Sequence, residues 1–131
     1  MLEVAARRAV QAWAEAVDGD DSALHAIATP EAVRGLLHPG DPGGQTRLVV
    51  RGPRVKHMAV TALDAGADPP TMAIEVEIVG RRYIEDRNTT AVLAGSQTRA
   101  ATFTEHWTLA LAGDATTPWR IVAVGTPVAR A

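Results

Sequence analysis

The residue whose type and position best suggest chemistry is Glu105, a carboxylate in a row of apolar residues. In the segment 98–111, the residues that alternate on one side of an extended chain are Ala101, Phe103, Glu105, Trp107, Leu109 and Leu111. Alternation with a period of two predicts a strand with one buried face. Because an unpaired buried carboxylate is costly, we expect Glu105 to have a partner or a shifted pKa.

Two interpretations of Glu105 follow from this position. It is either a general acid or base in a pocket or one half of a structural ion pair at the rim of the sheet. Arg81 and Arg82 lie on the strand that precedes it in the sequence. A hairpin between the two strands would place Glu105 opposite residues 79–81. The ion pair is therefore the favoured interpretation, with Arg82 as the partner.

Other catalytic and metal-binding patterns are missing from the sequence. The chain has no cysteine, which excludes disulfides, thiolate metal sites and cysteine nucleophiles. The four histidines, His25, His38, His57 and His106, match no metal-binding spacing. Asp20 and Asp21 resemble catalytic aspartates of small cone-shaped enzymes, but their place between two helices favours capping. The sequence predicts neither a metal nor a cofactor.

Basic residues give the strands a local positive character. They are Arg47, Arg51, Arg54, Lys56, Arg81 and Arg82. They could contact anionic lipid headgroups or an acidic partner, but solvated charge along strand edges is the favoured interpretation. The net charge of −2 argues against a nucleic-acid partner.

Size and composition are those of one soluble domain. The chain has 131 residues, of which 47% are hydrophobic and 21% charged. No apolar run is long enough to cross a membrane, and the charged residues within 1–17 argue against a signal peptide. We expect a cytoplasmic protein that contacts the inner membrane peripherally, or an extracytoplasmic one if the chain is a fragment of an anchored protein.

The periodicity predicts helices first and strands after them. The expected helices cover residues 2–17, 23–29 and 31–37. Gly19 suits the end of the first helix, and Thr29 with Pro30 suits the start of the third. The segment 38–45 contains two prolines and three glycines. It predicts a mobile loop that is dispensable for folding.

After this loop the hydrophobic period changes to two. The expected strands cover residues 48–50, 55–63, 72–85, 98–111 and 119–124, with breaks or bulges at Gly52-Pro53 and Gly80. Short connections without helices between them predict antiparallel pairing. The fold class is therefore α+β, with N-terminal helices packed on a curved antiparallel β-sheet and with Trp13 packed across its concave face.

The last two strands resemble a known family signature. The run Phe-Thr-Glu-His-Trp-Thr-Leu at 103–109, a polar turn, and then Trp-Arg-Ile-Val at 119–122 is similar to the C-terminal pattern of the Tim44-like domain, a member of the NTF2-like superfamily. The resemblance covers roughly residues 53–125. Leu109 stands where an aromatic residue is common in the family.

The resemblance implies an NTF2-like cone, in which the sheet wraps the first helix and leaves an apolar cavity. Tim44-like domains are regarded as non-enzymatic, and the mitochondrial member is a peripheral inner-membrane scaffold that contacts cardiolipin. The long N-terminal region with which that member binds its partners has no counterpart in this sequence. We therefore do not carry import-motor function over to this chain.

The expected function is a single-domain, non-enzymatic scaffold that binds a ligand or partner in an apolar pocket. The predicted ligand-binding residues are Trp13, Met72, Ile74, Phe103 and Trp107, with Glu105 and Arg82 as polar anchors. The ligand would be a lipid acyl chain or an apolar peptide. The alternatives are a small enzyme of the polyketide-cyclase or ketosteroid-isomerase type, and an accessory subunit that forms a homodimer through its sheet.

Overall fold

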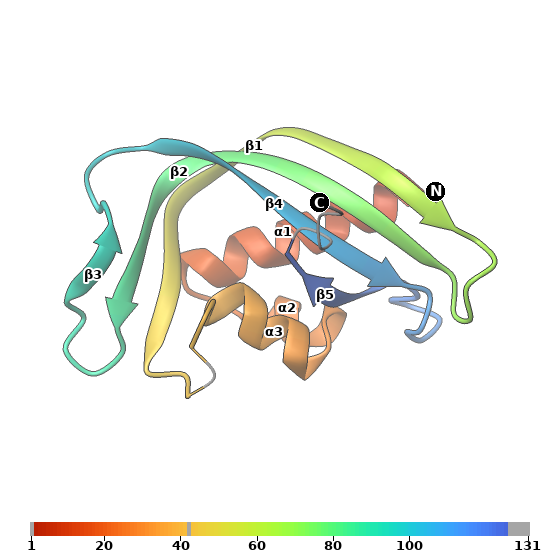
Figure 1. Ribbon diagram of the computed structural model, residues 1–131, viewed down its shortest axis with the longest axis horizontal. Coiled ribbons are helices and arrows are strands. Elements are labelled where there is room, and N and C mark those ends of the chain that lie inside the picture. The colour runs from red at the N-terminus through yellow and green to blue at the C-terminus, as the bar shows by residue number, and fades with distance from the viewer. Residues whose placement is uncertain (1, 42, 126–131) are drawn as a thin grey trace, which may run out of the picture.

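A strongly curved antiparallel sheet arches over three helices (Figure 1). The computed structural model describes residues 2–41 and 43–125. The helices are α1 (Leu2–Asp18), α2 (Ser22–Ile27) and α3 (Pro30–Leu37). The strands are β1 (Thr46–Asp64), β2 (Thr71–Asp86), β3 (Val92–Gly95), β4 (Ala101–Ala110) and β5 (Arg120–Val124). The predicted α+β class and the order of helices before strands are confirmed.

The helix ends follow local signals in the sequence. α1 ends at Asp18, and Gly19 follows with a φ of 149°, a backbone conformation that favours glycine. α3 begins at Pro30, and the Thr29 hydroxyl accepts a hydrogen bond from the Ala32 amide at 3.2 Å. Both predicted boundaries are confirmed.

The sheet has the strand order β1-β2-β4-β5, and β3 pairs with the end of β2 that β4 leaves free. β3 was not predicted from the sequence, because all four of its residues are exposed and it shows no buried face. Its presence means that β2 and β4 are not joined by a simple hairpin. The described part of β5 pairs with β4 at the other side of the sheet.

The curvature of the sheet arises mainly in β1. Its pairing with β2 shifts register at three points, between Arg51 and Arg54, Val55 and His57, and Val60 and Ala62. Each extra residue bends the strand. Residues 48–50 and 55–63, predicted as separate strands, are therefore parts of one strand.

Gly80 lies in β2 opposite the first of these bulges, and is not itself bulged. A Cβ atom at this position would lie 2.7 Å from Val50 Cγ1 and 3.4 Å from Pro53 Cα. The close approach of β1 at its bulge explains why a glycine stands here.

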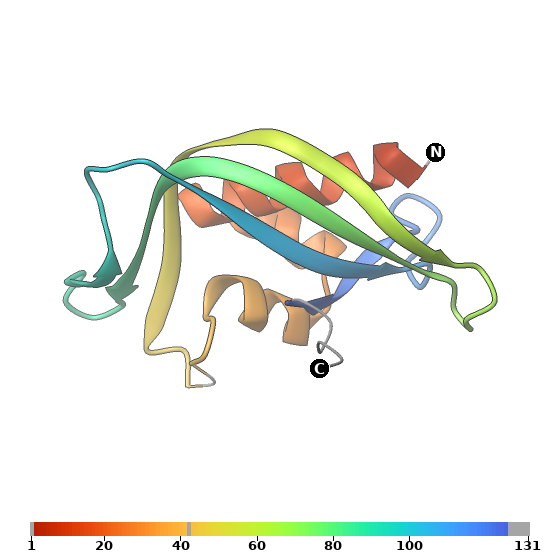
Figure 2. The ribbon, with the colours of Figure 1, turned by 45° about the horizontal axis from the view of Figure 1, so that its top comes forward.

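The core lies between α1 and the concave face of the sheet. Trp13 is fully buried, and its ring centroid lies 6.3 Å from that of Phe103 and 5.7 Å from that of Trp107. The view in Figure 2 shows α1 running beneath the arch, beside the outer edge of β1. α1 therefore packs against the concave face through Trp13, as predicted.

The loop after α3 makes several hydrogen bonds to other segments of the chain. The Asp41 carboxylate accepts hydrogen bonds from the Thr46 amide at 2.7 Å and the Thr46 hydroxyl at 2.8 Å. Arg87 donates to the Gly44 carbonyl at 3.1 Å. These hydrogen bonds join the described residues of the loop to β1 and to the segment after β2, and the predicted mobility of the loop stays a prediction. Pro42, in the middle of the segment, lies outside the described residues.

Candidate ligand-binding site on the concave face

The register between β2 and β4 places the predicted site residues on one face of the sheet. Phe103 pairs with Ile78, Glu105 with Val76, and Trp107 with Ile74. Since the aromatic rings of Phe103 and Trp107 contact Trp13 of α1, this face is the concave one. Glu105 therefore lies between two aromatic residues on the side of the sheet that faces the helices.

Only part of this face has surface that a ligand could contact. Trp13, Met72, Ile74 and Trp107 are 0–1% exposed. A side chain that lined a cavity wide enough for a water molecule would keep accessible surface, so in this structure these four residues belong to the packed core.

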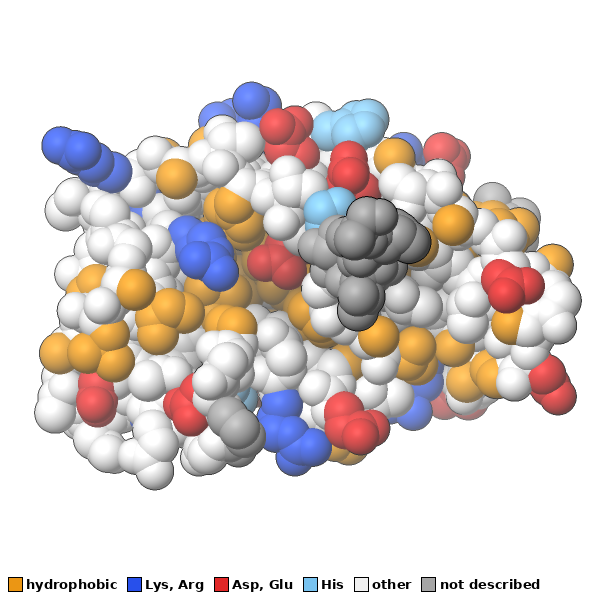
Figure 3. Space-filling model, viewed as in Figure 1, with side chains coloured by type: hydrophobic (Ala, Val, Ile, Leu, Met, Phe, Trp, Pro, Cys, Tyr) orange, Lys and Arg blue, Asp and Glu red, His pale blue; other side chains and the backbone are white. Residues whose placement is uncertain are grey.

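Phe103, Glu105 and Arg82 are only partly buried. We call these three residues the concave-face site. Figure 3 shows a hollow on the open side of the arch, where hydrophobic side chains surround an acidic one.

Glu105 is held in a defined position by an aromatic neighbour. Its carboxylate accepts a hydrogen bond from the Trp107 indole N–H at 3.2 Å. Burial raises the pKa of Glu105, and the Trp107 hydrogen bond together with the positive charge of Arg82 offsets part of this rise. The site thus contains a carboxyl group that is protonated more readily than an exposed glutamate.

Arg82 does not pair with Glu105. Its guanidinium lies over the Phe103 ring, 5.3 Å from the centroid, in a cation–π contact. None of the ion pairs in the described residues joins Arg82 to Glu105. The predicted ion pair is therefore wrong.

The reason is the register of the sheet. Glu105 lies opposite Val76 and not opposite residues 79–81, because the regular pairing of β2 with β4 is offset from the register expected for the hairpin.

Two basic residues of β1, Arg47 and Arg51, have structural partners on α1. Arg47 donates to the Ala16 carbonyl at 2.7 Å, and Arg51 donates to the Asp18 carbonyl at 2.7 Å. Both therefore satisfy carbonyl groups at the C-terminal end of α1, where a positive charge is favourable. This role was not foreseen, because it depends on how β1 passes the helix end.

The convex face of the sheet carries a separate polar pair. His106 lies 3.1 Å from the Glu75 carboxylate, its neighbour across β2 and β4. His106 thus points away from the concave-face site, although it is adjacent to Glu105 in the sequence.

Neither a metal centre nor a membrane span is found in the described part of the chain. No group of three or more histidine or acidic side chains there could hold a metal ion. Within residues 2–41 and 43–125, no helix combines the length and apolar character that crossing a bilayer requires.

The chain matches no model of a known protein family and no curated protein sequence. The arguments for function below therefore rest on the geometry of the concave-face site.

Proposed function

We propose that this protein is a non-enzymatic binding domain of the NTF2-like type, related to Tim44-like domains. The order of helices and strands and the curved sheet around α1 support the proposal. The run at 103–109, with its Glu and Trp on one face of β4, is the part of the sequence that carries the resemblance.

The ligand we propose is an amphipathic molecule, such as a lipid, with one polar head group. The observation that carries this proposal is the half-buried carboxyl of Glu105, oriented by Trp107 and flanked by the accessible ring of Phe103. Ligand sites of this kind combine an apolar wall with a few placed polar groups. Phe103 would contact the apolar chain, and Glu105 and Arg82 would contact the head group.

The chemistry of the two anchors predicts how they divide this task. Arg82 offers N–H donors to a carboxylate or carbonyl oxygen. Glu105, whose pKa is raised by burial, can accept a hydrogen bond when ionised and donate one when protonated. A ligand carboxylate would therefore depend on Arg82, whereas a neutral hydroxyl group would not.

Calorimetric titration with dodecanoate and with dodecanol tests this proposal. Both probes should bind with one molecule per chain. Phe103→Ser should weaken both by about tenfold or more, because it removes the apolar wall. Arg82→Gln should weaken dodecanoate alone. Arg81→Gln is the matched control, since Arg81 is exposed and adjacent in β2, and it should change neither affinity.

Native mass spectrometry of protein purified without detergent would add an independent result. A lipid retained by the parent protein and lost from Phe103→Ser would support the site. If neither probe binds, or if Phe103→Ser leaves both affinities unchanged, the proposed site is wrong. The same spectra report stoichiometry and so test a homodimer formed through the sheet.

A second function is favoured by one observation, the raised pKa of Glu105. A carboxyl with such a pKa is suited to proton transfer, as in small enzymes of the ketosteroid-isomerase type. Glu105→Gln separates the two functions. An enzyme would turn over a ketosteroid substrate in the parent protein and lose that turnover in Glu105→Gln, whereas a binding domain would show no turnover in either and keep dodecanol binding within about threefold.

A further inference from the structure

The first half of β4 forms a free edge of the sheet beside the concave-face site. β5 pairs with β4 only along residues 107–110, and no other described strand lies on that side of β4. Figure 2 shows the first half of β4 at the front of the arch, with no strand on its outer side. We call residues 101–105, on the side away from β2, the β4 edge.

The backbone of the β4 edge is regular and points its polar groups outward at alternate residues. The Gly125 N–H donates to the His106 carbonyl at 2.8 Å, so the backbone groups of His106 face the outer side of β4. Because these directions alternate along a strand, Thr102 and Thr104 also face outward. Both threonines are exposed, and β4 pairs with β2 without a register shift. The edge is therefore a template for a further strand.

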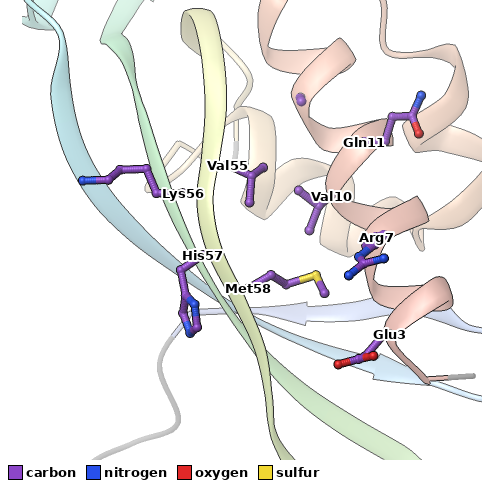
Figure 4. A pocket seen from close by; sticks show the side chains of 9 residues that line it. Glu3, Arg7, Val10, Gln11, Val55, Lys56, His57 and Met58 are labelled. Atoms are coloured by element: carbon purple, nitrogen blue, oxygen red, sulfur yellow. The ribbon is translucent and has the colours of Figure 1, made fainter.

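The opposite edge of the sheet, along β1, offers no such template. Its pairing with β2 shifts register between Val55 and His57. A groove of about 590 Å³ separates this part of β1 from α1. Figure 4 shows Glu3 and Arg7 together on the helix side of the groove, while Lys56 extends away from it. Charges of both signs on an irregular edge favour no particular occupant.

The chain itself cannot extend β5 regularly along the β4 edge. In the register that pairs Trp107 with Val124, residue 127 falls opposite Thr104. This residue is Pro127, which has no backbone N–H to donate to the Thr104 carbonyl. A regular strand on this edge therefore has to come from another chain.

A second copy of β4 fits the edge when the Phe103 residues of the two copies lie opposite each other. In this antiparallel register, Thr102 of each copy lies opposite Thr104 of the other, which is the hydrogen-bonded pairing that the outward backbone groups require. Such threonine pairs also stabilise the convex face. The Phe103 residues form the closer, non-hydrogen-bonded pair, with Cα atoms about 4.5 Å apart. Part of the exposed surface of each ring is then covered.

The same register gives Glu105 a partner of opposite charge. Glu105 lies opposite the uncharged Ala101 of the second copy, and Arg99 of that copy follows two residues further along the chain. Diagonal neighbours across two strands are about 7–8 Å apart, which an arginine side chain spans. Arg99 is exposed and takes part in none of the ion pairs in the described residues. Two-fold symmetry repeats the contact, so each copy provides one Arg99 and one Glu105.

We infer that two copies of this chain associate through their β4 edges into one continuous sheet, and that each copy completes the concave-face site of the other. The second copy's Phe103 extends the apolar wall, and its Arg99 lies beside Glu105. Hydrogen-bond direction, apolar contact and charge all select the same register. The interface is one short strand pair, so the dimer is weak and reversible. The pairing does not depend on the ligand-binding function proposed above.

Sedimentation equilibrium without ligand, over a range of protein concentrations, tests the inference. The parent protein should form a reversible dimer. Arg99→Glu and Glu105→Lys should each weaken the dimer by about tenfold or more, because each places like charges together. An equal mixture of the two variants should associate within about threefold of the parent, since every introduced charge then meets its opposite. Arg54→Glu is the matched control, because Arg54 is exposed on β1 at the other edge, and it should leave the dimer unchanged.

Thr104→Pro tests the backbone pairing. It removes an outward N–H, whereas the hydrogen bonds from β4 to β2 come from the alternate residues, so the variant should fold and stay monomeric. Thr104→Val keeps the N–H and should dimerise within about threefold of the parent. Circular dichroism checks that each variant is folded, and Thr104→Pro decides the outcome if Glu105→Lys does not fold.

Three results would overturn the inference. They are a parent protein that stays monomeric at every concentration, a dimer that persists in Thr104→Pro, and folded charge variants that fail to associate when mixed. A dimer that survives Thr104→Pro would form through another surface, such as the face of the sheet. Because association is measured without dodecanoate or dodecanol, its failure is distinct from failure of the ligand-binding function.

Discussion

Truncation of Trp13 to alanine tests the packing on which the whole concave face depends. Trp13 is fully buried and its ring contacts both Phe103 and Trp107. Replacing a buried tryptophan by alanine costs about 3–5 kcal/mol. The two aromatic contacts add about 0.5–1.5 kcal/mol each and favour the upper part of this range.

One feature of the indole offsets part of this loss. The Trp13 Nε1–H is buried and has no hydrogen-bond partner among the described residues, and an unsatisfied buried donor costs about 1–3 kcal/mol in the native state. We therefore expect Trp13→Ala to lower the free energy of unfolding by about 4 kcal/mol. For a domain of this size that is a fall in Tm of about 15 °C. Trp13→Phe removes the unpaired donor but keeps an aromatic ring, so it should cost only about 1–2 kcal/mol.

Urea unfolding followed by circular dichroism measures these differences. Gln11→Ala is the control on the same helix, because Gln11 is exposed, and it should change the free energy of unfolding by less than about 0.5 kcal/mol. A loss below about 1 kcal/mol for Trp13→Ala would mean that α1 does not pack across the sheet through this residue.

Three further substitutions test particular features. Burial raises the folded pKa of Glu105 above its unfolded value, so ionisation favours the unfolded chain. The Glu105→Gln protein should therefore unfold at a higher urea concentration than the parent at pH 7, and at the same urea concentration below the unfolded pKa of Glu105. A large loss of stability at pH 7 would instead support the ion-pair hypothesis. Hydrogen bonds from Thr46 lower the pKa of Asp41, so Asp41→Asn should lower the Tm at neutral pH. The difference should vanish as the pH falls through the folded pKa of Asp41, and an unchanged Tm at pH 7 would show that these bonds are not important. Gly80→Ala brings a Cβ atom to 2.7 Å from Val50 Cγ1 and should lower the free energy of unfolding by about 1–3 kcal/mol in the same urea assay. An unchanged free energy of unfolding would mean that β1 moves at its bulge to make room for the Cβ atom.

The sequence alone determined the parts of this protein that depend on neighbouring residues. The end of α1 at Gly19 and the start of α3 at Thr29 and Pro30 follow from backbone preferences that act over a single helical turn. The alternation along β4 likewise showed that Glu105 shares a face with Phe103 and Trp107. It also showed that this carboxyl needs either a partner or a shifted pKa; in the structure Trp107 donates a hydrogen bond to it, and burial raises its pKa.

Only the tertiary structure decided what lies opposite each of these residues. The register that places Val76 beside Glu105 is a property of the pairing between β2 and β4, and β3 is a strand without a buried face that the periodicity does not reveal. The bulge of β1 lies across from Gly80 and not within β2. Trp107 and Phe103 are both aromatic residues of β4 that contact Trp13 of α1, but Trp107 is fully buried and Phe103 stays partly exposed. Such distinctions arise from contacts between residues far apart in the chain, because burial depends on which elements finally pack together.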